Sequence, residues 1–332
     1  DMAFDHFFPL SHAIRRLETA GKPIAAAIAG VALGGGCELA MGAHHRIATR
    51  SPRSMLGLPE CAVGLLPGAG GTQRTPRLVG LELGLDVLLL GTRLQGETAL
   101  SSGLVHALVD EGEEVAAAEA WLLSPQAHSC QPWDQPGAAP LAHAAIAPLL
   151  AAHRQRELGR MLGHEPAPLA ILDCVELGLI QPIDGAIRAE MSVFARLIQR
   201  REARNMIRTL FLGKQAWDKA APAGAIPAMI GTAAERIAGA AATALAAGPA
   251  MIRAGFGGGQ ATAPVQERVA AGYWLEGQAD LRAAIAPLAE ACAAELSGLG
   301  ADQALLLDHA VVRNGTIPAY LGGATGVAAL AG

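Results

Sequence analysis

The chain has 332 residues, which is enough for two domains or for one large domain with an extensive core. Its formal charge of −5 argues against a general binder of nucleic acids or anionic membranes. Five cysteines without CxxC spacing indicate neither a disulfide framework nor a zinc site, so a reduced, cytoplasmic setting is expected.

The N-terminal part of the chain predicts a helix followed by a buried strand. Within residues 1–19, Leu10, Ile14 and Leu17 recur at helical spacing, with charged residues on the other side. Residues 24–28 are small and apolar and are bounded by proline and glycine, which is typical of a short strand that is buried on both faces.

A triple glycine, Gly34 to Gly36, follows this strand where the chain is expected to turn into a helix. Glycine at this point lets the backbone approach a ligand closely. The first N–H groups of a helix have no intrahelical partner and can bind an oxygen that carries negative charge. Glu38 lies in the first turn of the same helix, so a carboxylate is expected beside these donors.

A second carboxylate, Glu60, follows 22 residues later. Residues 45–49 predict the next strand, and Pro59 fixes the backbone just before Glu60 and so helps to orient its side chain. The glycine-rich loop over residues 66–74 then leaves room for an acyl chain at another helix start.

The following segments alternate between helix and strand, which indicates an α/β fold. Helices are expected over residues 76–90, 95–101 and 116–123, and a strand over residues 104–109. Residues 124–148 are rich in proline, glycine, glutamine and histidine and predict a linker or an irregular excursion. Four histidines in or near this part are too scattered for a metal site and are expected at the surface: His128, His143, His153 and His164.

Three motifs, in this order and spacing, resemble the enoyl-CoA hydratase/isomerase (crotonase) family. They are GGGCELAMGAHHRIA, GLPE and GLLPGAGGTQRTPRLVG, which lie within residues 34–80. The resemblance implies a crotonase-like ββα spiral core. It also implies that Glu38 and Glu60 are the catalytic pair and that the Gly35 N–H forms one side of an oxyanion hole. We expect the substrate to lie against Gly34, Leu58, Pro59, Pro67, Gly68 and Gly70.

In this family, further residues precede the first predicted helix and supply a second oxyanion donor. Nothing in the chain resembles that loop, so we expect either a core whose N-terminal part is missing or an oxyanion hole with one donor. Because preorganised donors are often the largest catalytic term, the absence of one would lower activity strongly.

Residues 164–219 predict two or three helices. One stripe of the second helix is apolar, and its arginines gather on the other side, where they form either a solvated face or a contact for coenzyme A phosphates or a partner subunit. The segment resembles the connector of multifunctional fatty-acid oxidation proteins, which joins their hydratase part to a 3-hydroxyacyl-CoA dehydrogenase part. The stripe consists of Ile187, Met191, Phe194 and Ile198.

No NAD-binding domain is expected after this connector. The glycines of residues 255–259 follow no predicted strand and lie in no βαβ pattern, so they do not form a dinucleotide site. Two alanine-rich helical units over residues 226–255 and 265–326 loosely resemble the C-terminal repeats of 3-hydroxyacyl-CoA dehydrogenases. The longest uncharged stretch, residues 237–252, is interrupted by Pro249 and predicts a buried helical region, not a membrane span.

The sequence thus predicts an α/β core followed by an all-helical region. The expected segments are a crotonase-like hydratase core (1–125), an irregular linker (126–163), a helical connector (164–219) and an alanine-rich helical region (226–332).

The resemblance implies an enoyl-CoA hydratase of fatty-acid β-oxidation, a lyase that converts trans-2-enoyl-CoA into 3-hydroxyacyl-CoA. Glu60 would exchange the α-carbon proton, Glu38 would deprotonate water, and the two carboxylates would share one proton. Neither a metal nor a redox cofactor is required, because coenzyme A arrives as part of the substrate. The candidate partners are a second copy of the chain and a thiolase.

Two other functions stay open at this point. A Δ3-Δ2 enoyl-CoA isomerase has the same scaffold and can operate with one carboxylate, whereas the presence of Glu38 and Glu60 favours hydration. A non-catalytic acyl-CoA-binding or assembly subunit would fit a chain that lacks the second oxyanion donor and the nicotinamide domain.

Overall fold

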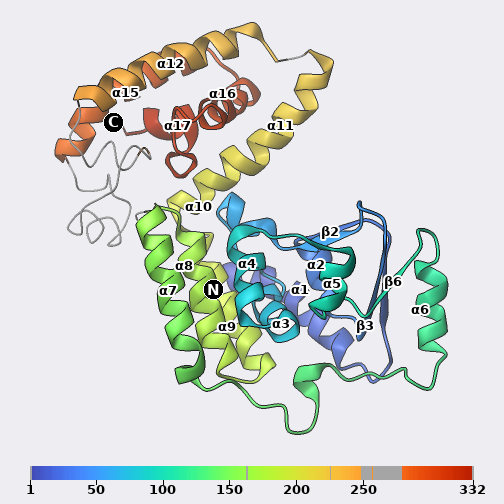
Figure 1. Cartoon of the computed structure of the whole chain (residues 1–332). Coiled ribbons are helices and arrows are strands. Elements are labelled where there is room, and N and C mark those ends of the chain that lie inside the picture. Colours follow the sequence, from blue (N-terminus) through green and yellow to red (C-terminus); the bar gives the residue numbers. More distant parts are fainter. Residues whose placement is uncertain (1, 162–163, 225, 248–255, 257–278, 331–332) are drawn as a thin grey trace. The chain divides into compact units, whose positions relative to one another are not determined.

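The computed structural model describes residues 2–161, 164–224, 226–247, 256 and 279–330 (Figure 1). The chain divides into two compact units, which are described separately below. Unit 1 consists of Asp1–His153 and Ala167–Leu197, and unit 2 consists of Arg154–Pro166 and Ile198–Gly332.

Two three-stranded sheets lie in the described part of unit 1. One has the order β1-β3-β6 with parallel pairing, and the other has the order β2-β4-β5, in which β2 and β4 are parallel and β5 is antiparallel to β4. The strands are β1 (Ala25–Ile28), β2 (Val31–Leu33), β3 (His45–Thr49), β4 (Met55–Gly57), β5 (Leu94–Gln95) and β6 (Ala107–Val109).

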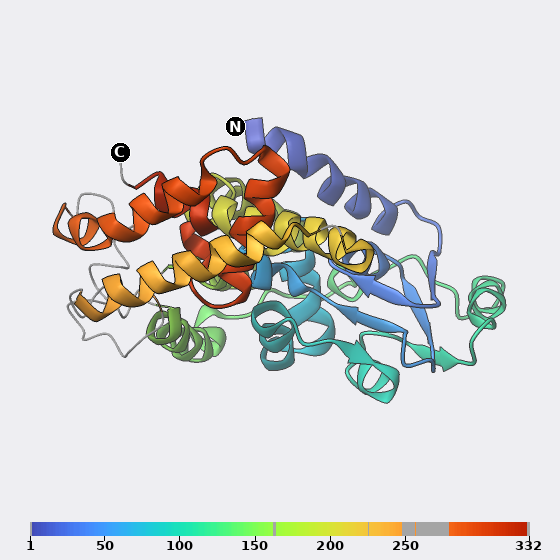
Figure 2. The same ribbon diagram turned by 90° about the horizontal axis from the view of Figure 1, so that it is seen from above.

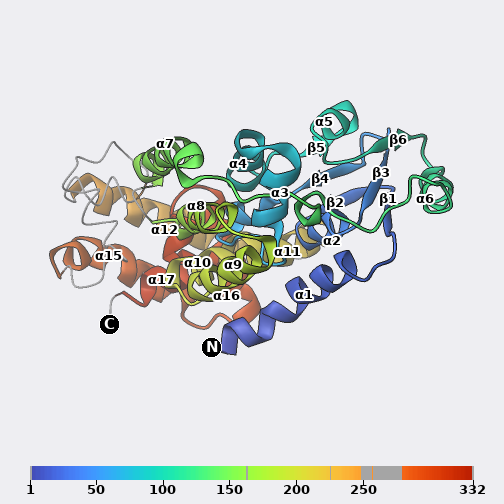
Figure 3. The same cartoon turned by 90° about the horizontal axis from the view of Figure 1, so that it is seen from below.

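Helices cover these sheets and form the rest of unit 1. Helix α6 packs on β1 and β3 (Figures 1 and 2), while α1 and α3 both contact α9 (Figure 3). Fully buried leucines, among them Leu56, Leu66 and Leu88, fill the core between the elements. The helices are α1 (Met2–Glu18), α2 (Gly35–Met41), α3 (Gly71–Val79), α4 (Leu81–Leu90), α5 (Gly96–Ser101), α6 (Glu114–Leu122), α8 (Pro166–Leu179) and α9 (Ile183–Leu197), with 3₁₀ turns η1 (Pro59–Val63) and η2 (Pro132–Asp134).

Strands β2, β4 and β5 were not expected, and two of the expected segments differ in the structure. The helix expected over residues 76–90 is two helices, α3 and α4, because Gly80 adopts a φ of 85° between them. Part of the expected irregular linker is helix α7 (His143–Met161). Pro148 is the sixth residue of α7 and removes one intrahelical hydrogen bond, but the residues after it are mostly good helix formers, which favours the helix.

Unit 2 is helical throughout its described residues. Helix α12 packs against α15 and α16, and α17 packs against the same two helices. Their shared core includes Ile237, Leu288 and Leu307. The elements are α10 (Arg201–Met206), a π-helical turn η3 (Ile207–Leu212), α11 (Gly213–Ala220), η4 (Ala221–Ala223), α12 (Ala228–Ala247), α15 (Ala279–Leu296), α16 (Ala301–Arg313), η5 (Ala319–Leu321) and α17 (Gly323–Ala328).

The predicted order, an α/β core followed by a helical region, is therefore confirmed. Most of the glycine cluster at residues 255–259 lies outside the described residues. None of the described helices is long and apolar enough to cross a membrane.

The prediction that the four scattered histidines lie at the surface is wrong for two of them. His153 and His164 are only 8% and 4% exposed. The ring of His164 stacks on Tyr320 with 4.5 Å between ring centroids, and burial lowers the pKa of His164 to about 3. Both are therefore packed side chains. Within the described residues, no cluster of three or more histidine, cysteine, aspartate or glutamate side chains could hold a metal ion.

Candidate active site

Two parallel strands bring the predicted carboxylates to one end of a sheet. Strands β2 and β4 pair with Leu33 opposite Gly57, and the N–H of Gly34 donates to the carbonyl of Gly57 at 2.9 Å. The chain leaves β2 into α2, which carries Glu38, and leaves β4 into η1, which carries Glu60. Both glutamates thus follow strand ends that are hydrogen-bonded to each other.

The side chain of Glu60 lies against Gly34. A Cβ built on Gly34 would be 2.7 Å from Oε1 of Glu60, which is closer than two such atoms can approach. Gly34 also has φ 57° and ψ −131°, a backbone conformation that favours glycine. The turn into α2 therefore favours glycine, and a side chain here would also displace the Glu60 carboxylate from its position.

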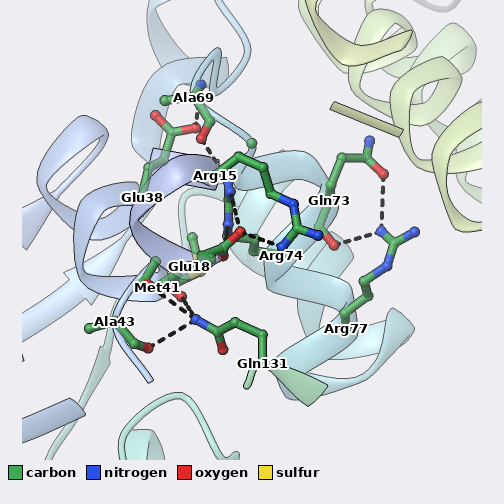
Figure 4. A network of polar contacts seen from close by, with 12 residues as sticks. Arg15, Glu18, Glu38, Met41, Ala43, Ala69, Gln73, Arg74, Arg77 and Gln131 are labelled. Atoms are coloured by element: carbon green, nitrogen blue, oxygen red, sulfur yellow. Dashed lines mark hydrogen bonds and ion pairs between the residues drawn. The ribbon is translucent and has the colours of Figure 1, made fainter. Parts of the chain in front are cut away.

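Glu38 is held by the glycine-rich loop that precedes α3. Its Oε1 accepts hydrogen bonds from the N–H groups of Ala69 and Gly71, each at 2.7 Å, and Figure 4 shows the Ala69 contact. The side chain is buried, whereas its Oε2 makes no hydrogen bond to any described residue. One oxygen is therefore fixed by the backbone, and the other is available for a small molecule such as water.

Burial dominates the electrostatics of this pair. It raises the pKa of Glu38, although the two N–H groups and the charge of Arg74 oppose the shift. Burial and the nearby charge of Glu38 raise the pKa of Glu60 to about 7. Oε2 of Glu60 is buried and has no hydrogen-bond partner among the described residues, which also disfavours its charged form. The pair therefore holds a proton close to neutral pH.

Arg74 fixes the loop from the other side. Its Nη1 donates to the carbonyl of Ala69 at 2.8 Å, and its Nε and Nη2 donate to the Glu18 carboxylate at 2.7 and 3.1 Å (Figure 4). The side chains of Arg74 and Glu18 are both fully buried. A buried ion pair with α1 thus anchors the residue whose N–H binds Glu38.

Gln131 fixes the far end of α2. Its side-chain amide nitrogen lies within hydrogen-bonding distance of the carbonyls of Met41, Gly42 and Ala43, at 3.3, 3.1 and 3.2 Å (Figure 4). The amide nitrogen has two hydrogens, so it can donate to two of these carbonyls at a time, and the Ala43 carbonyl also accepts from Nη1 of Arg46 at 2.6 Å. The contact therefore supports the C-terminal end of the helix that carries Glu38.

The other predicted site residues have different surroundings. Gly35 is exposed, and its N–H makes no hydrogen bond to a described residue.

The residues predicted to contact the substrate pack mainly against other parts of the protein. Leu58 is fully buried, Pro67 packs against Gly71, and Gly68 lies against the ring of Phe194. Gly70 has a φ of 95° and donates its N–H to Glu190. Pro59 lies beside Gly91. Their predicted contacts with a substrate stay predictions.

Sequence reasoning missed four residues of this site. Ala69 and Gly71 act through backbone N–H groups, which leave no trace in a side-chain pattern. Arg74 lies within the third motif but was given no role. Glu190 lies on α9 and is discussed below; the signal for it was a charged residue among the apolar positions of the 187–198 stripe.

Comparison with known proteins supports the resemblance. Residues 6–131 match the family model described as enoyl-CoA hydratase/isomerase, and all three motifs lie within this range. "Fatty acid oxidation complex subunit alpha" of Shewanella loihica is 35% identical over 222 residues, which cover 63% of this chain and 30% of the relative. "Peroxisomal fatty acid beta-oxidation multifunctional protein AIM1" of Arabidopsis thaliana is 34% identical over 202 residues, which cover 59% and 28%. The aligned part thus spans about 30% of the length of these curated relatives.

Solved structures match over part of the chain. The structure of DspI from Pseudomonas aeruginosa is 42% identical and covers 36% of this chain and 48% of its own, with a TM-score of 0.34. An enoyl-CoA hydratase structure from Geobacillus kaustophilus is 21% identical and covers 60% and 62%, with a TM-score of 0.32. Both TM-scores lie below 0.5.

Proposed function

We propose that the protein is an enoyl-CoA hydratase that adds water to a trans-2-enoyl-CoA, with residues 6–131, which match the enoyl-CoA hydratase/isomerase family model, as its catalytic part. The observation that carries this proposal is the pair of carboxylates at the paired ends of β2 and β4, of which Glu38 is buried and Glu60 is partly buried. Hydration needs one group that accepts a proton and one that delivers a proton.

The proposed reaction uses the two carboxylates in turn. Oε2 of Glu38 takes a proton from water while the water oxygen bonds to the β-carbon of the substrate. Electrons of the double bond move toward the thioester oxygen, and the N–H of Gly35 stabilises the resulting enolate. Glu60, whose pKa is about 7, then delivers its proton to the α-carbon. After the reaction Glu38 is protonated and Glu60 is deprotonated. Exchange of protons with solvent restores the starting state.

The substrate is proposed to lie between the start of α2 and the loop before α3, in contact with Gly34, Pro67 and Gly68. Coenzyme A enters as part of this substrate, and the reaction is redox-neutral. The names of the relatives support a place in fatty-acid β-oxidation. We also propose a cytoplasmic location, and a thiolase or a second copy of the chain as partner.

Isomerisation of the double bond is the second candidate on the same scaffold. It can proceed with one carboxylate that removes and returns a proton. Glu60 has a raised pKa and lies near a second carboxylate, Glu38, which is buried. This favours hydration, because hydration uses one of these groups to deliver a proton and the other to accept one.

The test is the loss of the conjugated-thioester absorbance of crotonyl-CoA in the presence of the purified protein. Glu60→Gln is expected to slow this loss on the order of 10²- to 10⁴-fold. Glu97→Gln is the matched control, because Glu97 is an exposed glutamate on α5 with a side chain that is 76% accessible. Equal rates for wild type and Glu60→Gln would remove the site assignment. If the protein converts neither short nor long enoyl-CoA substrates, a non-catalytic acyl-CoA-binding or assembly role becomes the better interpretation.

A further inference from the structure

A third carboxylate, Glu190 of α9, contacts the loop that holds Glu38. Its Oε1 accepts the N–H of Gly70 at 2.7 Å, and its Oε2 accepts the N–H of Thr72 at 3.0 Å and the Thr72 hydroxyl at 2.5 Å. The N–H groups of residues 69–72 therefore alternate between two carboxylates. The first and third bind Glu38, and the second and fourth bind Glu190.

Burying the Glu190 side chain costs free energy, so its hydrogen-bond partners are informative about its role. The residue has no exposed surface, and its hydrogen-bond partners are neutral N–H and O–H groups, not a cation. Burying a carboxylate without a paired cation is unfavourable unless hydrogen bonds compensate it. Glu190 thus spends its hydrogen-bonding capacity on two residues of one loop.

The loop turns at Gly70, between the residues that bind the two carboxylates. Gly70 has a φ of 95°, and a Cβ at this position would overlap the guanidinium of Arg74 at 1.7 Å. The peptide N–H vectors of such a turn point alternately to opposite sides, so fixing Gly70 and Thr72 on one side sets the direction of Ala69 and Gly71 on the other. Burial and the charge of Glu38 raise the pKa of Glu190 to about 8, whereas its hydrogen bonds with Thr72 and Gly70 and the charge of Arg74 oppose the shift.

We propose that Glu190 is a positioning residue that acts through Glu38. By binding Gly70 and Thr72, it aims the N–H groups of Ala69 and Gly71 at Oε1 of Glu38 and so fixes the carboxylate that takes the proton from water. The catalytic part of this inference rests on the proposed hydratase function, whereas the positioning part does not.

Glu190→Gln tests the proposal. The amide oxygen can still accept one N–H, but the NH₂ group cannot accept the other, so the loop loses part of its support. Amide hydrogen exchange of Ala69 and Gly71, measured by NMR, should become about 10- to 100-fold faster in this variant, although neither N–H touches Glu190. Glu202→Gln is the control, because Glu202 is also buried but is paired with Arg200.

Turnover of crotonyl-CoA gives the second readout. Glu190→Gln should lower kcat about 10- to 100-fold in the wild-type background, because a displaced base costs a factor of this size. In a Glu38→Gln background the same change should cost less than twofold, since the group through which it acts is already neutral. An equal loss in both backgrounds would overturn the action through Glu38.

A more conservative pair of variants covers the case in which Glu190→Gln does not fold. Thr72→Val removes only the hydroxyl that donates to Glu190 and should make exchange of Ala69 and Gly71 roughly 2- to 10-fold faster, whereas Thr72→Ser should match wild type. Unchanged exchange at both amides in folded Glu190→Gln or Thr72→Val would overturn the proposal. If the wild type hydrates no enoyl-CoA, the proposed function fails, and the exchange rates alone decide whether Glu190 positions the loop.

Discussion

The Glu60 carboxylate lies against Gly34, so that a Cβ on Gly34 would be 2.7 Å from Oε1 of Glu60 and would displace this carboxylate. The same glycine joins β2 to α2 and donates its N–H to Gly57, the last residue of β4. One residue therefore determines both how Glu38 leaves the sheet and where the Glu60 carboxylate lies.

Gly34→Ala should consequently impair both stability and activity. The positive φ and the contact with Glu60 together are expected to cost about 1–3 kcal/mol of unfolding free energy, which urea denaturation would measure. Hydration of crotonyl-CoA should fall because Glu60 is displaced. Gly36→Ala is the matched control, because a Cβ there meets nothing within 4 Å. Equal stability and activity in the two variants would contradict the role given to Gly34.

From the sequence, Glu38 and Glu60 are predicted as the candidate catalytic carboxylates, and the strands that extend over enough residues are recognised. The expected strand over residues 45–49 coincides with β3, and β1 lies within the expected 24–28. Strands β2 and β4 were not predicted, because three residues each are too few to show a period; β6 is equally short, but it lies within the longer apolar stretch 104–109 where a strand was expected. The pairing of β2 with β4, which brings Glu38 and Glu60 to one place, therefore could not be predicted either.

The support of Glu38 was hidden for a different reason. Glu190 is 120 positions from Gly70 in the chain, and its partners are backbone N–H groups whose directions depend on the loop conformation. A charged residue beside the apolar stripe of a helix was the available sign, but such a residue more often lies at the edge of the solvated face.

Glu38→Gln and Glu38→Ala should separate catalysis from stability. The amide oxygen of glutamine can still accept the N–H groups of Ala69 and Gly71, so this variant should hydrate crotonyl-CoA much more slowly, with a residual rate, but keep its unfolding free energy. Alanine leaves both donors without an acceptor and should cost about 1–3 kcal/mol for each. Urea denaturation and the crotonyl-CoA assay measure the two effects. Equal stability of the two variants would show that these hydrogen bonds are not needed to hold the loop.

Gly35→Pro should remove the proposed oxyanion donor without breaking α2. Proline suits the first position of a helix, where its missing N–H has no intrahelical partner. The expected loss in kcat is on the order of 10²- to 10³-fold. Gly35→Ala keeps the N–H and has open space for its Cβ, so it should turn over at nearly the wild-type rate. Wild-type turnover in the proline variant would exclude this N–H as the donor.

Neutralising Glu60 should stabilise the protein, and the gain should depend on pH. The folded-state pKa of Glu60 is raised from 4.5 to about 7, so between these values the folded state binds more protons than the unfolded state, and stability falls as pH rises. Glu60→Gln removes this loss. Its advantage in unfolding free energy over wild type should therefore grow from pH 4.5 to pH 7 by roughly 3 kcal/mol and then level off.

Urea denaturation at several pH values measures this difference, with Glu97→Gln as the control for the chemical change at an exposed site. A constant difference between pH 4.5 and pH 8 would mean that Glu60 titrates as it does in the unfolded chain and would remove the physical reason for assigning it the proton-delivering role.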